Sequence, residues 1–203
     1  MLNGLVYFSV KAFGYKNAKF AVFVVDSTAF LYYTVKNGKR RYTMDKTIDN
    51  LRIRLVTSED KQLIYNFFRQ LGEEGSTFFN RYSGNEKGAY QFIEGNSPDR
   101  IYWAAVDDTE NGEEFAGIVF LWRKNTGVPW LGIGITEKWK GKHLGRRLMT
   151  TAREWAESVG AGGIMLTTAQ NNVRGQGLYE RMGYEKVGTY NDGEILYLLT
   201  FRA

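Results

Sequence analysis

The sequence predicts an α/β (α+β) protein preceded by a small N-terminal β-meander. Residues 131–184 support the first part, because a strand, a glycine-rich basic loop and an amphipathic helix are followed by a second strand and a second helix. Residues 1–50 support the second part, because three of their runs are rich in β-branched and aromatic residues. Of the 203 residues, 43% are hydrophobic and 15% are aromatic, which suffices for a sizeable core.

The first quarter of the chain differs from the rest in charge. Residues 1–50 hold eight Lys/Arg against three Asp/Glu, whereas residues 51–203 hold nineteen of each, so the net charge of +5 arises entirely in the first quarter. An Asn37-Gly38 turn would join two of its strands. We expect residues 1–50 to form a small basic β-rich domain with a linker over 44–50, and residues 51–203 to form a second domain.

Basic, aromatic β-structure can bind single-stranded nucleic acid, because bases stack on aromatic rings beside a positive groove. A sheet of three or four strands also needs one buried face, so we expect Phe20, Val22 and Val24, or their alternates, to pack against the neighbouring domain or a second subunit. Lys39, Arg40 and Arg41 then form a solvated hairpin end. Nucleic-acid binding is therefore disfavoured, and a homodimer is left open.

The second region begins with elements that its pattern predicts plainly. Residues 51–56 alternate as a strand does, and Ser58 would cap a helix with Leu63, Phe67 and Leu71 on its apolar face. Residues 72–96 follow as an irregular, aromatic stretch. Four further strands are expected as two hairpins, over 101–107 with 115–122 and over 184–190 with 194–201, the second turning at Asn191, Asp192 and Gly193.

The loop over 139–146 carries only positive charge and opens a helix. Leu131, Ile133 and Ile135 alternate before it, and the helix has one apolar stripe that ends at Gly160. Backbone N–H groups at such a turn, with the positive end of the helix dipole, suit a pyrophosphate. A plain strand-to-helix connection is the alternative, and the loop lacks the Gly-Lys-Ser/Thr of a Walker motif. The stripe consists of Leu144, Leu148, Ala152, Trp155, Ala156 and Val159.

A second strand and helix follow over 163–168 and 171–184, with Asn172 as the helix cap. At these two segments the chain resembles the GNAT superfamily of N-acetyltransferases, over about residues 51–203. The family's cofactor loop, Arg/Gln-x-x-Gly-x-Gly/Ala, corresponds to Lys140, His143 and Gly145, with histidine where glycine is usual. A loop backbone in an ordinary conformation would tolerate that histidine. The family's second motif, Asn-x-x-Ala-x-x-Leu-Tyr-x-x-x-Gly-Phe, corresponds to Asn172, Gly175, Leu178, Tyr179, Gly183 and Tyr184.

The resemblance implies a mixed, mostly antiparallel central sheet with helices on both faces, and acetyl-CoA in a gap between the strands 131–136 and 163–168. Backbone groups of Ile133 and Ile135 would bond the pantetheine arm, and Asn172 would contact it near the thioester. Arg174 would reach the adenosine-side phosphate or remain a solvated helix arginine. Pyrophosphate would be bound by backbone N–H groups of Lys140, Gly141, Lys142, His143, Leu144, Gly145 and Arg146.

The resemblance also implies that the hydroxyl of Tyr179 serves as the general acid at the cofactor sulfur, although a tyrosine at helical spacing is ordinarily core. Family members that acetylate protein N-termini often carry a glutamate where this chain has Thr167, which cannot act as a base at neutral pH. The remaining candidate bases are Glu73, Glu74, Asp107, Asp108 and Glu137, each with the alternative of a solvated charge.

The sequence thus predicts a cytoplasmic transferase, an acyltransferase that moves an acetyl group from acetyl-CoA directly to a primary amine. The acceptor is a small molecule or peptide, and Glu73, Glu74 and Glu86 favour a cationic amine, while nearby aromatic residues suit an aromatic one. With no cysteine and one histidine, no metal is expected, and no membrane span is predicted. The alternatives are a non-catalytic acyl-CoA sensor and a protein that binds nucleic acid or ribosomes through its basic β region.

Overall fold

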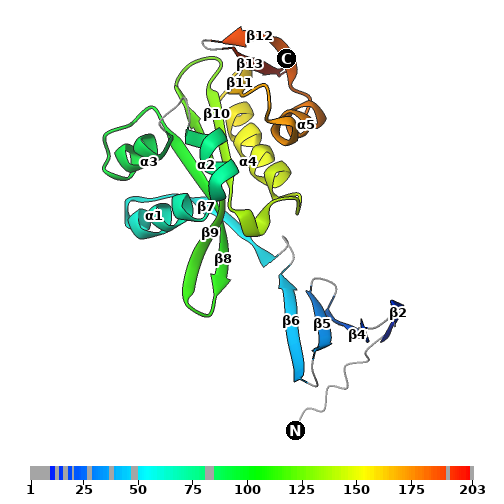
Figure 1. Ribbon diagram of the computed structural model, residues 1–203. Helices are drawn as coiled ribbons and strands as arrows, with labels where there is room; N and C mark the ends of the chain where they lie inside the picture. Colours follow the sequence, from blue (N-terminus) through cyan, green and yellow to red (C-terminus); the bar gives the residue numbers. More distant parts are fainter. Residues whose placement is uncertain are drawn as a thin grey trace. The chain divides into compact units, whose positions relative to one another are not determined.

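The computed structural model describes the backbone of residues 10–11, 14–15, 18–19, 21–26, 29–36, 39–46, 50–80, 85–190 and 193–201, and the side chains of residues 50–79, 85–190 and 193–201. The chain divides into two compact units, residues 1–51 and 52–203, which are described separately (Figure 1). No helix in the described ranges is both long enough and apolar enough to cross a membrane.

The N-terminal unit consists of β-strands, as predicted. Its four-stranded antiparallel sheet has the order β1-β4-β5-β6, and β2 pairs with β3 as a separate two-stranded ribbon. Because β6 continues to Lys46, the prediction that a linker begins at residue 44 is wrong. The Asn37-Gly38 turn lies outside the described residues, as do the side chains for which packing or solvent exposure was predicted: Phe20, Val22, Val24, Lys39, Arg40 and Arg41. The strands are β1 (Val10–Lys11), β2 (Gly14–Tyr15), β3 (Ala18–Lys19), β4 (Ala21–Asp26), β5 (Ala29–Lys36) and β6 (Lys39–Lys46).

The second unit is built on a seven-stranded sheet of order β12-β13-β11-β10-β9-β8-β7. All its neighbours are antiparallel except β10 and β11, which confirms the predicted mixed, mostly antiparallel sheet. Both predicted hairpins are present, as β8 with β9 and β12 with β13. The strands are β7 (Arg52–Leu55), β8 (Ile101–Thr109), β9 (Gly112–Trp122), β10 (Trp130–Ile135), β11 (Gly163–Thr168), β12 (Glu185–Tyr190) and β13 (Glu194–Thr200).

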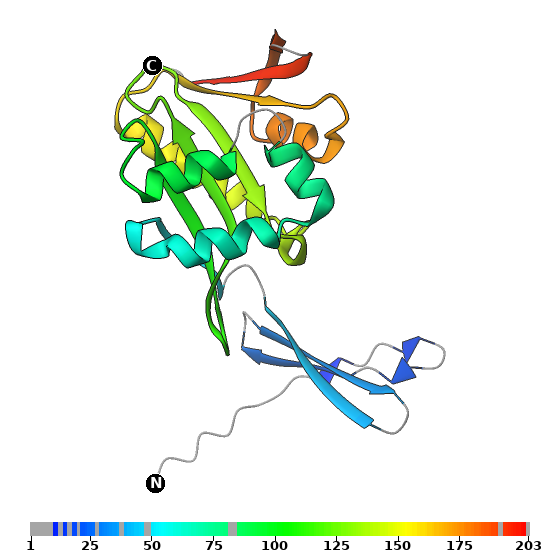
Figure 2. The same ribbon diagram turned by 60° about the vertical axis from the view of Figure 1, so that its left-hand side comes forward.

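Helices cover both faces of this sheet. Figure 2 shows α1 (Lys61–Arg69), α2 (Gly72–Asn80) and α3 (Asn85–Ile93) on one side and α4 (Leu144–Ser158) on the other. Successive residues of β8 pack on opposite faces of the sheet. On the α1 side, the ring of Tyr102 stacks on that of Phe120 with centroids 4.6 Å apart, and on the other side Trp103 contacts Trp155 of α4 with centroids 5.8 Å apart. The last helix, α5 (Val173–Arg181), packs beside α4.

Three local predictions are corrected by the structure. Thr57, not Ser58, caps the first turn, because its N–H donates to the Asp60 carboxylate at 2.8 Å and Ser58 lies inside the 3₁₀ turn η2 (Ser58–Asp60). The stretch over 72–96 is not irregular, since most of it forms the two helices α2 and α3. Val159 ends the apolar stripe of α4 in a half-exposed position at the C-cap, whereas Leu144, Leu148, Ala152 and Ala156 are buried as predicted.

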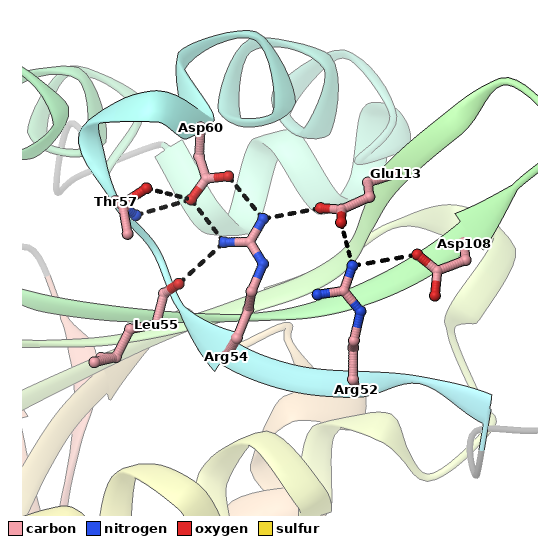
Figure 3. A network of polar contacts seen from close by, with 7 residues as sticks. All are labelled: Arg52, Arg54, Leu55, Thr57, Asp60, Asp108 and Glu113. Carbon is pink, nitrogen blue, oxygen red and sulfur yellow. Dashed lines mark hydrogen bonds and ion pairs between the residues drawn. The ribbon is translucent and has the colours of Figure 1, made fainter.

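An ion-pair network fixes the edge strand β7 to the first helix and to the β8–β9 hairpin (Figure 3). Arg54 binds the Asp60 carboxylate with both ends of its guanidinium, at 2.8 and 2.7 Å, and reaches Glu113 at 3.0 Å. Arg52 pairs with Glu113 and, at 3.2 Å, with Asp108. Burial would raise the pKa of Asp60, but the hydrogen bonds from Arg54 and Thr57 outweigh it and hold the pKa below its ordinary value.

Replacing the buried carboxylate by Asp60→Asn should lower the free energy of unfolding by about 3 kcal/mol at pH 7, because Arg54 loses its bidentate partner. Since the pKa of Asp60 is lowered by folding, its stabilisation is complete above about pH 4 and is lost as the pH falls through the folded value. The difference between wild type and variant should therefore shrink below pH 4.

Urea unfolding followed by tryptophan fluorescence measures the free energy of unfolding of wild type and variant at each pH. The signal comes from residues 52–203, since all five tryptophans lie there. Asp108→Asn is the matched control at the exposed end of the same network and should change the unfolding midpoint little at any pH. An equal loss for Asp60→Asn at pH 7 and pH 3 would contradict the assignment.

Candidate functional site

The second unit contains a cleft of about 970 Å³ that runs along β10. One part of it is bounded by the loop between β10 and α4 and by α5, and another by α2 and the aromatic ends of β9 and β10. The ionisable side chains in its wall are mostly cationic, which favours a polyanionic ligand. They are Glu74, Arg100, Lys140, His143, Arg146, Arg174, Arg181 and Glu194.

The cleft exists because two parallel strands separate. Within the described strands, β10 pairs with β11 only at Trp130 and Met165, where the Met165 N–H donates to the Pro129 carbonyl at 2.9 Å. Each strand is held on its other side by a full antiparallel partner, β9 for β10 and β13 for β11. Ile133 and Ile135 therefore lie on a β10 edge with no paired strand beyond Trp130, so the gap predicted from the sequence is present.

The loop between β10 and α4 has two residues with left-handed backbone, Gly141 at φ 76° and His143 at φ 62°. The expectation of an ordinary backbone at His143 is wrong, and the glycine usual at this position would adopt that φ without strain. In the described part of the chain, the N–H groups of Gly141, His143, Leu144 and Gly145 donate to no backbone carbonyl. The Lys140 and Arg146 N–H groups are already used, at 3.4 and 3.2 Å.

The side chains around this loop differ in the contacts that they make. The Lys140 ammonium is held by Glu137 at 2.6 Å and by Glu74 at 3.3 Å, so it fixes the loop to α2. Lys142 lies 5.0 Å from the ring of Trp139. Arg174 lines the cleft, and its guanidinium lies beside Gly141, where a Cβ on that glycine would be 3.7 Å from Nη2.

Gly145 and Asn172 fix how α4 and α5 meet at the cleft. A Cβ on Gly145 would lie 2.8 Å from Leu178 and 3.2 Å from Ile135, so only glycine permits this contact between the helices and β10. The Asn172 side chain accepts from the Gly175 N–H at 3.0 Å and donates to Thr168 Oγ1 at 2.9 Å. The predicted cap is confirmed, and both ends of the Asn172 amide are engaged within the protein.

Tyr179 is buried, with 7% of its surface exposed, and it lines the cleft. Its hydroxyl is hydrogen-bonded to Thr168, which also accepts from Asn172. Burial raises the pKa of Tyr179 to about 12, despite the bond to Thr168, and the negative charge of Glu194 contributes to the rise. The phenol therefore keeps its proton at neutral pH.

The structure brings none of the five base candidates to Tyr179. Glu74 and Glu137 hold Lys140, Asp107 is buried against Lys138 at 2.9 Å, and Asp108 pairs with Arg52. Glu73 is exposed and lies outside the cleft wall. Glu86, a candidate attraction for a cationic acceptor, accepts from the Tyr90 hydroxyl at 3.1 Å.

Sequence reasoning missed several side chains that the fold places in the cleft. Glu194, at the start of β13, lines it and has no ion pair with any described residue. Strand register is the signal that could have found it, because Glu194 pairs with Tyr190 next to the end of β11. Arg100, Trp122 and Trp130 also line the cleft, and none of them was predicted from the sequence as a site residue. No group of three potential metal ligands occurs among the described residues.

Comparison with known proteins agrees with this geometry. The acetyltransferase (GNAT) family model matches residues 64–184, more than half of the chain. An uncharacterised protein of Methanocaldococcus jannaschii is 29% identical over 100 residues, which make up 48% of this chain and 20% of that protein. The matched segment thus spans about a fifth of that relative's length.

Solved structures share the fold of the second unit. The GNAT domain of S. lividans PAT has a TM-score of 0.63 and 18% identity, covering 74% of this chain and 90% of that one. A domain from M. jannaschii has a TM-score of 0.61 and 22% identity, covering 74% and 98%. The PaiA N-acetyltransferase from Thermoplasma acidophilum, in complex with coenzyme A, has a TM-score of 0.58 and 16% identity, covering 74% and 99%. The family model matches residues 64–184, and the second unit has the cleft and the glycine-containing loop between β10 and α4 described above. The chain belongs to the GNAT acetyltransferase family, a family of acyltransferase enzymes.

Proposed function

We propose that residues 51–203 form an acetyl-CoA-dependent N-acetyltransferase that transfers the acetyl group directly to a primary amine, and that residues 1–50 form a separate basic domain. The observation that carries the proposal is that one cleft contains the gap between β10 and β11, the loop with unused N–H groups, and the buried hydroxyl of Tyr179. The division of the chain into two compact units near residue 51 supports the proposed domains.

The residues around the gap fit coenzyme A. The unpaired edge of β10 at Ile133 and Ile135 would bond the amide groups of the pantetheine arm as an added strand does. Unused N–H groups at the start of α4 would bind the pyrophosphate, with the helix dipole adding to their attraction. Arg174 and Arg146 would supply positive charge there, while Lys140 acts by fixing the loop rather than by binding phosphate. Asn172 positions α5 and the Thr168–Tyr179 pair.

Two side chains would move the protons of the reaction. The amine nitrogen forms the amide bond as the carbon–sulfur bond breaks, so the amine loses a proton and the leaving thiolate gains one. Glu194, directly or through one water, would accept the amine proton, since it is the carboxylate of the described cleft wall that no cation holds. Tyr179 would donate to the thiolate, and its raised pKa keeps the needed proton in place.

Tyr179→Phe should lower kcat about 100-fold while leaving acetyl-CoA affinity unchanged, because the phenol acts at the leaving group. Release of coenzyme A thiol, with polyamines, amino acids, aminoglycosides and peptides as acceptors, measures kcat, and the absence of cysteine keeps the readout clean. Calorimetry measures cofactor affinity.

Tyr184→Phe is the matched control for this variant. The Tyr184 hydroxyl is equally buried, has no partner among the described residues, and lies outside the cleft wall, so its loss should leave kcat unchanged. Equal kcat values for Tyr179→Phe and wild type would remove Tyr179 from the mechanism. Cofactor binding by wild type without turnover on any acceptor would favour the sensor function.

Glu194→Gln should lower kcat/KM about 100-fold at pH 7, and the deficit should shrink as the pH approaches the pKa of the acceptor amine, because solvent then supplies the free amine. A pH profile of kcat/KM for wild type and variant measures this. Glu73→Gln changes an exposed glutamate outside the cleft wall and should leave the profile unchanged. A deficit that is constant with pH would mean that Glu194 is not the base.

A further inference from the structure

The aromatic end of the cleft holds a guanidinium, that of Arg100, which has no carboxylate partner among the described residues. Arg100 precedes β8 and lines the cleft, and its Nη1 donates to the Tyr102 hydroxyl at 3.2 Å. Its guanidinium lies 6.0 Å from the ring of Phe120 and 5.9 Å from that of Trp122. These contacts fix the position of the positive charge and leave most of its N–H donors without an acceptor in the described residues.

No described residue neutralises the charge of Arg100. Arg52, Arg54 and Arg153 each pair with a carboxylate within 4 Å, and Arg100 pairs with none in the described ranges. Asp99 acts on the Tyr102 hydroxyl electrostatically but forms no ion pair with Arg100. A half-buried cation against aromatic rings has lost part of its hydration, so an anionic ligand would bind it more strongly than it would bind a solvated arginine.

Helix α3 makes room for this guanidinium. A Cβ on Gly88 would lie 2.1 Å from Nη1 of Arg100 and 2.8 Å from Cζ, so any side chain at this position would displace the arginine. Glycine inside a helix lowers helix stability relative to alanine. Its presence in the middle of α3 is explained by the space that Arg100 occupies.

This positive charge is separate from the proposed pyrophosphate site. Arg100 lies against Trp122, which pairs with Trp130, the first residue of β10. The loop between β10 and α4, where the pyrophosphate would bind, follows the last residue of the same strand, Ile135. Five residues of extended strand span roughly 17 Å. Between Arg100 and the proposed proton-transfer groups runs an aromatic wall, with ring centroids 5.5 Å apart for Trp122 and Trp130 and 5.2 Å apart for Trp130 and Tyr190. Tyr190 pairs in register with Glu194.

We propose that the acceptor of this enzyme carries a carboxylate or similar anionic group, bound by Arg100, and an apolar body on the aromatic wall, with its amine toward Glu194 and Tyr179. The inference rests on the proposed acetyl transfer. It reverses the preference for a cationic amine suggested by Glu73, Glu74 and Glu86. Glu73 lies outside the cleft wall, Lys140 holds Glu74, and Glu86 is bound by Tyr90. A polyamine would place a second cation near the Arg100 guanidinium and be repelled by it.

Matched acceptors test the charge requirement. 4-(Aminomethyl)benzoate is compared with 4-(aminomethyl)benzamide, and L-phenylalanine with phenylalaninamide and 2-phenylethylamine, each with acetyl-CoA in the thiol-release assay. In at least one series the carboxylate form should have a KM about 10- to 100-fold lower than its neutral analogue, as expected for a charge-assisted hydrogen bond. Quenching of tryptophan fluorescence by the acceptors with coenzyme A bound gives a readout independent of turnover, since Trp122 and Trp130 lie in the wall.

Variants assign the effect to Arg100. Arg100→Met should abolish the KM difference by raising the KM of the carboxylate form to that of its neutral analogue. Gly88→Ala, which displaces the guanidinium, should reduce the same KM difference. Arg123→Met is the matched control, because Arg123 lies over the same Trp122 ring at 5.3 Å but is exposed and outside the cleft wall. Thermal unfolding confirms that each variant is folded.

The outcomes separate this inference from the proposed function. Turnover with no carboxylate preference in any series, or a preference that survives in Arg100→Met, would overturn the inference while leaving the acetyltransferase intact. Cofactor binding without turnover on any acceptor would contradict the proposed function, and carboxylate-dependent quenching that Arg100→Met removes would then still support the anion site.

Discussion

The separation of β10 from β11 is the constraint on which the rest of the site depends. Strand β10 is paired along its length with β9, and β11 is paired along its length with β13. Within these described strands, β10 and β11 pair with each other only at Trp130 and Met165. Unpaired backbone groups beside a gap need partners, because leaving them buried and unsatisfied is costly. A ligand that supplies alternating amide groups would meet that need, so the proposed cofactor site depends on the gap rather than on any single side chain.

Helix packing positions the other parts around this gap. Gly145 lets α4 approach Leu178 of α5 and Ile135 of β10 within van der Waals contact, and the same approach aims the start of α4 at the end of the gap. Asn172 caps α5 and binds Thr168, and Thr168 binds Tyr179, so one chain of hydrogen bonds links the end of β11 to the buried phenol. The loop proposed to bind pyrophosphate and the proposed proton donor are thus positioned by the two helices that border the gap.

Charge is distributed unevenly along the cleft. Near the loop, Lys140 is neutralised by Glu74 and Glu137 and serves to fix α2 against the loop, while Arg174 remains beside Gly141. At the far end, Arg100 lies against aromatic rings with no carboxylate partner among the described residues, and Glu194 lines the same cleft as Tyr179. A cleft with two separated cationic regions and one unheld carboxylate favours a polyanionic cofactor together with an acceptor that bears both an amine and an anion.

The sequence by itself determined the elements and the family. Period-2 and period-3.6 patterns predicted the strands and α4, and the motif from Asn172 to Tyr184 indicated the cap, the buried Tyr179 and the GNAT resemblance, because local spacing encodes local structure. Only the tertiary structure decided which of the described charged side chains form ion pairs and which line the cleft without one. Lys140 binds an acid that lies 66 residues away in the sequence, Arg100 fills the space beside Gly88, and strand pairing brings Glu194 to the cleft wall. Local spacing contains none of these contacts. The left-handed backbone at His143 was also set by the connection between β10 and α4. A histidine adopts this conformation only rarely, so its presence in the sequence does not predict it.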